Sequence, residues 1–248
     1  MSSSTYPLTT NPTVWGSYLN RKLTTDEHLI LKFVESENRY NKQLDNLANI
    51  ASAKNLHIPA LTDLYGNCLF ESLQILNVID DYKEFRKDIA FMMKIFKNDK
   101  LFEIHDETLE TLFGMYNEIG NEIGYVVNSH DNKLYKYTYD IMCKDLSNNN
   151  SWTRTPTELV LLCISYILDI KIIIISDTTT YVHEIYVNTS KAPYNTIYLG
   201  HLGEIHYVPL AKNEDGKTYV VPKYTESRLD FHKWARKMAH KEENAEEA

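Results

Sequence analysis

Apolar residues recur every three or four positions over a long stretch near the start of the chain. They are spaced to line one side of a helix, and they are Leu29, Phe33, Tyr40, Leu44, Leu47 and Ala51. Thr24 and Glu27 precede them in the pattern of a capping box, which marks a helix start. We therefore predict one long helix over residues 25–54, which packs its apolar side on the rest of the protein. Residues 1–22 are expected to be irregular.

Shorter segments repeat this helical spacing farther along the chain. A helix is predicted directly after Cys68, where the apolar positions are Leu69, Phe70, Leu73 and Leu76. Further helices are predicted over residues 81–96, 101–119 (one or two), 135–146 and 157–168. Thr155 or Thr157 would cap the last of these helices, and the asparagine run at 148–150 marks a loop before it.

The last third of the chain alternates short runs of β-branched and aromatic residues with turn residues. These runs predict strands over residues 170–176, 181–187, 196–198, 204–210 and 218–221. The sequence Asn213-Glu214-Asp215-Gly216 favours a hairpin turn between the last two. Helices dominate the first part of the chain and strands the last, so the predicted fold class is α+β.

Composition narrows the class of protein. The length of 248 residues suits one domain with extensions, and a hydrophobic fraction of 43% supports a sizeable core. Only eight glycines and seven prolines are present, which argues against a sandwich of many tight turns. The net charge of −8 disfavours nucleic acid as a partner, because nucleic-acid binders carry clustered Lys and Arg. The basic residues near the C-terminus instead alternate with apolar ones, as in a solvated amphipathic helix with an acidic tip.

The cellular setting follows from the cysteines and from the lack of targeting signals. Three cysteines, Cys68, Cys143 and Cys163, are too few for a disulfide framework, which favours a reducing compartment. Residues 1–14 lack the basic and apolar order of a secretory signal. The most apolar segment, residues 160–175, is interrupted by polar side chains, so no membrane span is expected. The expected location is the cytoplasm.

Cys68 stands where a thiol nucleophile would work well. Gly66 permits a tight backbone turn, Asn67 tolerates turn conformations, and Cys68 then opens a predicted helix. A thiol in the first helical turn feels the positive end of the peptide dipoles, which favours the thiolate that attacks carbonyls. A buried and inert cysteine beside a helix start is the alternative interpretation.

A histidine late in the chain complements this cysteine. Gly203 lies in a turn that leads into a predicted strand containing His206 and Tyr207. A cysteine early in the chain and a histidine late is the order found in many thiol proteases, where the fold brings the two together. Cys163 and Cys143, in predicted apolar helix faces, are expected to be inert core residues.

Taken in order, these segments resemble the ovarian tumour (OTU) family of cysteine proteases. The segments are Gly66-Asn67-Cys68-Leu69-Phe70, Trp152, Glu158-Leu159, the strand at 170–175 and His206-Tyr207. The resemblance spans about Ile58 to Leu210. It implies a papain-type fold with helices around a small central, mostly antiparallel sheet. It also implies a deubiquitinase that cleaves isopeptide or peptide bonds after the C-terminal glycine of ubiquitin or a related modifier.

The resemblance also implies the roles of the site residues. Cys68 would form a thioester, and His206 would act as general base and then as general acid. Backbone N–H groups of Tyr65, Gly66, Asn67 and Cys68 would stabilise the oxyanion. No cofactor is expected, and the partner would be ubiquitin or polyubiquitin bound by a monomer. The lone catalytic domain and the composition suit a viral or bacterial effector in the host-cell cytoplasm.

Three regions are predicted around this resemblance. Residues 1–57 form an N-terminal segment with the long helix, and residues 58–222 form the OTU-like catalytic domain. Residues 223–248 form the C-terminal amphipathic helix and acidic tail.

Two departures from the family pattern leave the third catalytic residue open. The family usually has Asp at the position of Tyr65, and Asp or Asn two residues after the histidine, where this chain has Val208. Glu204 shares a strand face with the histidine, and Asp63 and Asp177 flank the expected site. A Cys–His pair without a third side chain is also open, because a thiol needs less help than a serine hydroxyl, as is a backbone carbonyl or neutral side chain in the orienting role.

Other functions remain to be distinguished. His201, Glu204 and His206 superficially suggest a metal cluster, but alternate strand positions with one histidine already assigned argue against zinc. An inactive OTU-like module that only binds ubiquitin is one alternative. A papain-like protease of other specificity is a second. A ubiquitin probe with an electrophilic C-terminus separates the first alternative from an active enzyme, and cleavage of a generic peptide would indicate the second.

Overall fold

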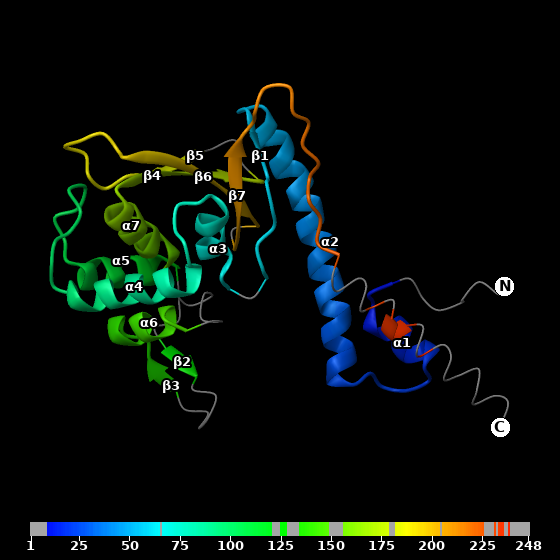
Figure 1. The fold of residues 1–248 in the computed structure, drawn as a ribbon. Helices are drawn as coiled ribbons and strands as arrows, with labels where there is room; N and C mark the ends of the chain where they lie inside the picture. The colour runs from blue at the N-terminus through cyan, green and yellow to red at the C-terminus, as the bar shows by residue number, and fades with distance from the viewer. Residues whose placement is uncertain are drawn as a thin grey trace. The chain divides into compact units, whose positions relative to one another are not determined.

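The computed structural model describes residues 9–64, 66–120, 125–127, 134–148, 156–178, 182–203, 205–225, 231, 233–235 and 238 (Figure 1). The chain divides into two compact units, one of residues 1–45 and 222–248, the other of residues 46–221. The long helix α2 (Thr25–Ser52) begins in the first unit and ends in the second, close to its predicted bounds. Among the described residues, no helix combines the length and the apolar character needed to cross a membrane.

The first unit has a small aromatic core. It contains a helix that the sequence pattern did not predict, α1 (Pro12–Tyr18), which Asn11 caps by accepting a hydrogen bond from the Thr13 amide at 2.9 Å. Pro12 occupies the first helical position, which suits proline because that N–H has no partner within a helix. The buried residues are Trp15, Leu31, Val34, Phe231 and Ala235. The expectation of an irregular segment over residues 1–22 is therefore wrong at α1.

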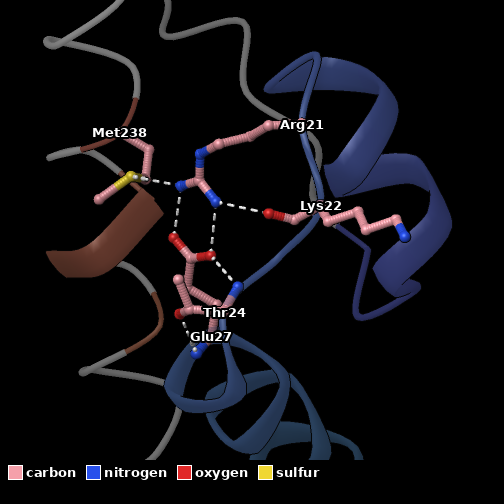
Figure 2. A network of polar contacts seen from close by, with 5 residues as sticks. All are labelled: Arg21, Lys22, Thr24, Glu27 and Met238. Atoms are coloured by element: carbon pink, nitrogen blue, oxygen red, sulfur yellow. Dashed lines mark hydrogen bonds and ion pairs between the residues drawn. The ribbon is translucent and has the colours of Figure 1, made fainter.

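The predicted capping box starts helix α2 (Figure 2). The Thr24 amide donates to Glu27 Oε2 at 2.8 Å, and the Glu27 amide donates to Thr24 Oγ1 at 3.3 Å. Arg21 binds the same carboxylate with two nitrogens, at 2.8 and 2.7 Å. These bonds, the one from Arg21 foremost, lower the pKa of Glu27 to about 2. The carboxylate therefore stays ionised and keeps both of its partners across the neutral and mildly acidic range.

The second unit is built on a five-stranded sheet. Its strand order is β1 (Leu56–His57), β7 (His206–Lys212), β6 (Asn195–Leu202), β4 (Ile170–Ser176) and β5 (Val182–Ile185). Strands β4 and β6 pair in parallel, and the other neighbours pair antiparallel. The predicted α+β class with a mostly antiparallel sheet is confirmed.

Helices lie on one side of this sheet, below it in the view of Figure 1, and carry most of the core. They are α3 (Cys68–Ile75), α4 (Tyr82–Ile95), α5 (Leu109–Gly120), α6 (Tyr139–Leu146) and α7 (Thr157–Leu168). Helix α3 packs on β7, and α7 packs on β4 and β5. Helices α4 and α5 contact α7 on its other side, and α6 contacts α4. All three cysteines are unpaired and buried in this core.

Several predicted elements need correction. Residues 218–221 form no strand, because β1 pairs with β7 in their place, with Leu56 opposite Lys212 and His57 opposite Ala211.

The bounds of two predicted helices also differ. Residues 101–108 are not helical, and the predicted helix at 135 begins at Tyr139, after the strand β3 (Leu134–Lys136). Strand β3 pairs with β2 (Tyr125–Val127) in a second small sheet. Pro156 takes the N-cap position of α7 without a side-chain bond, so Thr157 is the first helical residue and not its cap, and Thr155 lies outside the described residues.

One glycine in β6 allows α2 to approach the sheet closely. A Cβ at Gly200 would collide with the Leu47 side chain of α2 and lie 2.9 Å from Val208 Cγ2. Leu47 and Val208 are themselves fully buried. The end of the long helix therefore packs directly on β6, next to Val208 of the strand that carries His206.

Candidate active site

The predicted nucleophile begins helix α3, as its sequence context indicates. Gly66 has a φ of 90°, a left-handed conformation that side chains disfavour. Asn67 occupies the N-cap position but makes no side-chain cap bond, and Cys68 is the first helical residue. The tight turn therefore presents the thiol at the positive end of the helix.

A buried arginine holds this turn in place. Arg86 of α4 is 1% exposed and donates from Nη1 to the Gly66 carbonyl and to Asn67 Oδ1, both at 2.8 Å. Its Nε donates to the Leu146 carbonyl at 2.5 Å. Sequence reasoning missed Arg86. The available signal was its position three residues before Ile89, which places its cationic side chain on the apolar face of α4.

The strand that carries the histidine meets the cysteine at an unpaired edge. Within the described residues, β1 pairs with β7 only at Ala211 and Lys212, so the start of β7 faces α3 and the loop before it. In an antiparallel ladder, the N–H and C=O of one residue point to the same side. For Tyr207, that side holds Cys68 Sγ, which accepts from the Tyr207 amide at 3.4 Å. The peptide next to His206 thereby contacts the predicted nucleophile.

Thr62 completes this arrangement from the loop before α3. Its hydroxyl lies 2.6 Å from the Tyr207 carbonyl, to which it donates. The same oxygen lies 3.2 Å from His206 Nε2. Thr62 is 3% exposed, His206 4% and Cys68 2%. The histidine, the thiol and the threonine therefore lie together in a buried part of the protein. No sequence motif singles out Thr62, because this contact joins residues 144 positions apart.

Of the three carboxylates considered as the third catalytic residue, two lie among the described residues. Asp63 accepts from the Asn67 side chain at 3.1 Å and from the Asn67 amide at 3.4 Å. Asp177 accepts from the Gly203 amide at 2.9 Å and so braces the turn before β7. Glu204 lies outside the described residues, as do Tyr65 and Trp152. Val208 is fully buried.

Burial makes both members of the Cys–His pair neutral. Desolvation raises the pKa of the Cys68 thiol to about 11, against the bond from Tyr207 that lowers it, and the charges of Asp63 and Glu71 raise it further. Desolvation also lowers the pKa of His206 to about 4, although the charge of Asp63 opposes this shift. The sequence favoured a stabilised thiolate at the helix start. In the folded protein the loss of solvation outweighs the helix dipole.

These directions predict slow alkylation of the ligand-free protein at neutral pH. The rate constant for iodoacetamide at Cys68 should keep rising above pH 9, because the thiolate forms only as the pH approaches about 11. Free thiols reach their plateau earlier, with a pKa of about 8.5. Mass spectrometry of the Cys68 peptide across pH measures this profile. A plateau reached below pH 8 would show instead a thiolate stabilised by His206.

The side chains of the described residues offer no metal-binding group. Among the described residues, no three His, Cys, Asp or Glu side chains are grouped to hold an ion. His201 stacks on Tyr207 with ring centroids 4.5 Å apart and an interplanar angle of 12°. Its ring is thus used for packing on the neighbouring strand, while His206 contacts Thr62.

Comparisons with known proteins give matches among solved structures alone. No family model matches the chain, and no curated protein sequence matches it. The OTU domain of OTUD1 is 12% identical with a TM-score of 0.44, and the match covers 68% of this chain and 95% of that one.

Two further matches are structures determined with ubiquitin. An OTU domain in complex with ubiquitin is 16% identical with a TM-score of 0.41, covering 74% of this chain and 84% of that one. An OTU deubiquitinase from Wolbachia pipientis wMel bound to ubiquitin is 17% identical with a TM-score of 0.35, covering 64% of this chain and 97% of that one. All three are OTU domains, the family that the sequence motifs resemble.

Proposed function

We propose that this protein is a thiol-dependent deubiquitinase of the OTU type, with Cys68 as nucleophile and His206 as general base and acid. The observation that carries the proposal is the hydrogen bond from the Tyr207 amide to Cys68 Sγ, across 139 residues of sequence. It joins the start of α3 to the residue after His206. The substrate class rests on the resemblance of the Gly66-Asn67-Cys68 and His206-Tyr207 segments to the OTU family.

Because Cys68 and His206 are both neutral at pH 7, the reaction begins with transfer of the thiol proton to the imidazole. His206, with a pKa of about 4, is unprotonated at neutral pH and can accept the thiol proton as sulfur attacks. The S–C bond to the terminal glycine carbonyl forms, and the oxyanion is held by backbone N–H groups at the start of α3. The protonated imidazole then donates to the lysine amine as the C–N bond breaks. Water, deprotonated by His206, hydrolyses the thioester and returns the thiol.

An inactive ubiquitin-binding module is the second candidate. It is favoured by the burial of Cys68, by its raised pKa and by Val208 at the position where the family has Asp or Asn. Such a module would bind ubiquitin through the same fold without forming a covalent bond. A protease of other specificity would be distinguished by cleavage of peptides that lack folded ubiquitin.

A ubiquitin probe with an electrophilic C-terminus tests the proposal directly. The wild type should form a covalent adduct that intact-mass analysis detects, and Cys68→Ala should form none. Cys163→Ala should label like the wild type, because that cysteine is fully buried in α7. Binding of ubiquitin without an adduct would support the inactive module. The absence of both would reject ubiquitin as the substrate class.

A further inference from the structure

The histidine of a Cys–His pair must be held in one ring orientation and one tautomer. A carboxylate or amide two residues further along the strand usually does this in proteins with these motifs, but here that residue is Val208. Val208 is fully buried in the core and has no polar side-chain atom. Position 208 therefore supplies no orienting group, but a residue from another part of the described chain, Thr62, contacts the ring.

Thr62 has the right position for this task. Its Oγ1 lies 3.2 Å from His206 Nε2 and 2.6 Å from the Tyr207 carbonyl. A hydroxyl has one proton, and a carbonyl oxygen can only accept. The Thr62 proton is therefore given to Tyr207, and towards His206 the hydroxyl can only accept. Nε2 must then carry the ring proton of the neutral imidazole.

We propose that Thr62 is the positioning residue of His206, a neutral hydroxyl in the place that a carboxylate or amide usually takes. The inference rests on the proposed function. With the proton fixed on Nε2, the lone pair of the neutral ring lies on Nδ1, the atom that would take the proton of Cys68. The tie to the Tyr207 carbonyl fixes the hydroxyl relative to β7, so the acceptor cannot rotate away from the ring.

The charged and titratable neighbours of His206 are consistent with a neutral partner. Asp63 raises the pKa of His206 and His201 lowers it, but desolvation dominates and the pKa falls to about 4. A directly bonded carboxylate would stabilise the imidazolium and oppose that fall. The Asp63 carboxylate accepts from the amide and the side chain of Asn67 in the cysteine turn and also shares a hydrogen bond with the side chain of Glu71.

Variants at position 62 test the inference by kinetics. Thr62→Val keeps the side-chain shape and removes the hydroxyl, so kcat for di-ubiquitin cleavage should fall about tenfold or more. KM should change less than about twofold, since the loss is felt in the transition state. Thr62→Ser should restore most of kcat. A loss of kcat in Asp63→Asn as large as that of Thr62→Val would assign the orienting role to Asp63 and overturn the inference.

Ser165→Ala is a matched control for the loss of a buried hydroxyl. Ser165 is fully buried and donates to the Ile170 carbonyl at 2.7 Å, as Thr62 donates to that of Tyr207. The Ser165→Ala variant should lower the melting temperature about as much as Thr62→Val and leave kcat unchanged. Equal losses of kcat in the two variants would reduce Thr62 to a structural role and overturn the inference.

The tautomer of His206 provides a readout that needs no turnover. Nitrogen-15 spectra of histidine-labelled protein should show His206 with a protonated Nε2 and an unprotonated Nδ1, assigned by the signal lost in His206→Asn. Thr62→Val should shift this ring towards the other tautomer, and Thr62→Ser should not. The same tautomer in wild type and Thr62→Val would reject the inference. If the ubiquitin probe fails but the tautomer depends on Thr62, the proposed function falls while the contact stands.

Discussion

We expect His206→Ala to lower kcat/KM for di-ubiquitin by about a thousandfold or more. The wild-type thiol is almost entirely protonated at neutral pH, because burial raises the pKa of Cys68 to about 11. Attack therefore depends on a base that removes the proton during the reaction, and His206 is the proposed base. Steady-state cleavage of di-ubiquitin, followed by gel or by a fluorescent leaving group, measures the loss.

A double variant of Cys68 and His206 tests whether the two residues act together or independently. Residues that act as a unit have strongly non-additive effects, so His206→Ala combined with Cys68→Ala should be no slower than either single variant. Circular dichroism and thermal melts establish that each variant is folded. A His206→Ala enzyme within tenfold of wild type would mean that His206 is not the base and would contradict the mechanism.

Removing the buried arginine should have the largest effect on stability. Arg86→Met keeps a long side chain but leaves the Leu146 carbonyl, the Gly66 carbonyl and Asn67 Oδ1 without this donor. Each orphaned buried acceptor costs about 1–3 kcal/mol, partly offset because a buried cation is also removed. We expect a loss of about 3 kcal/mol in the free energy of unfolding. The melting temperature should fall by about 10 °C.

The same change should loosen the turn before the nucleophile and lower kcat even where the variant is fully folded. Lys87→Met is the matched control, because Lys87 is the next residue of α4 and is exposed, paired only with exposed Glu84 among the described contacts. It should change stability by no more than about 0.5 kcal/mol and leave kcat unaltered. Equal melting temperatures for Arg86→Met and Lys87→Met would show that Arg86 does not stabilise the site.

Elements with strong local signals follow from the sequence. The capping box and the apolar stripe predicted α2, and the observed helix differs by two residues at its end. Asp81 caps α4 through two amides, Lys83 and Glu84, at the start of the predicted segment. The apolar run of β4 matches its predicted bounds. In each case the decisive interactions lie within a few residues, so spacing along the chain records them.

Elements whose identity depends on distant partners were predicted less well. Residues 218–221 have β-rich composition, yet the edge of β7 that they would need is taken by β1 at Leu56 and His57. The run at 134–136 became a strand because residues 125–127 pair with it. Short strands gain their stability from cross-strand neighbours, so their existence is decided by pairing that local composition does not record.

The candidate site likewise has features that local sequence determines and features that depend on distant contacts. The sequence by itself determined the turn at Gly66, the helix that begins at Cys68 and the strand that carries His206, because local backbone preferences and residue order specify these. The tertiary structure alone decided that Thr62 and Arg86 would support the two residues, through contacts 144 and 20 positions apart along the chain. It also decided that the pair is neutral, since desolvation depends on everything packed around a group, whereas the helix dipole depends only on its own helix.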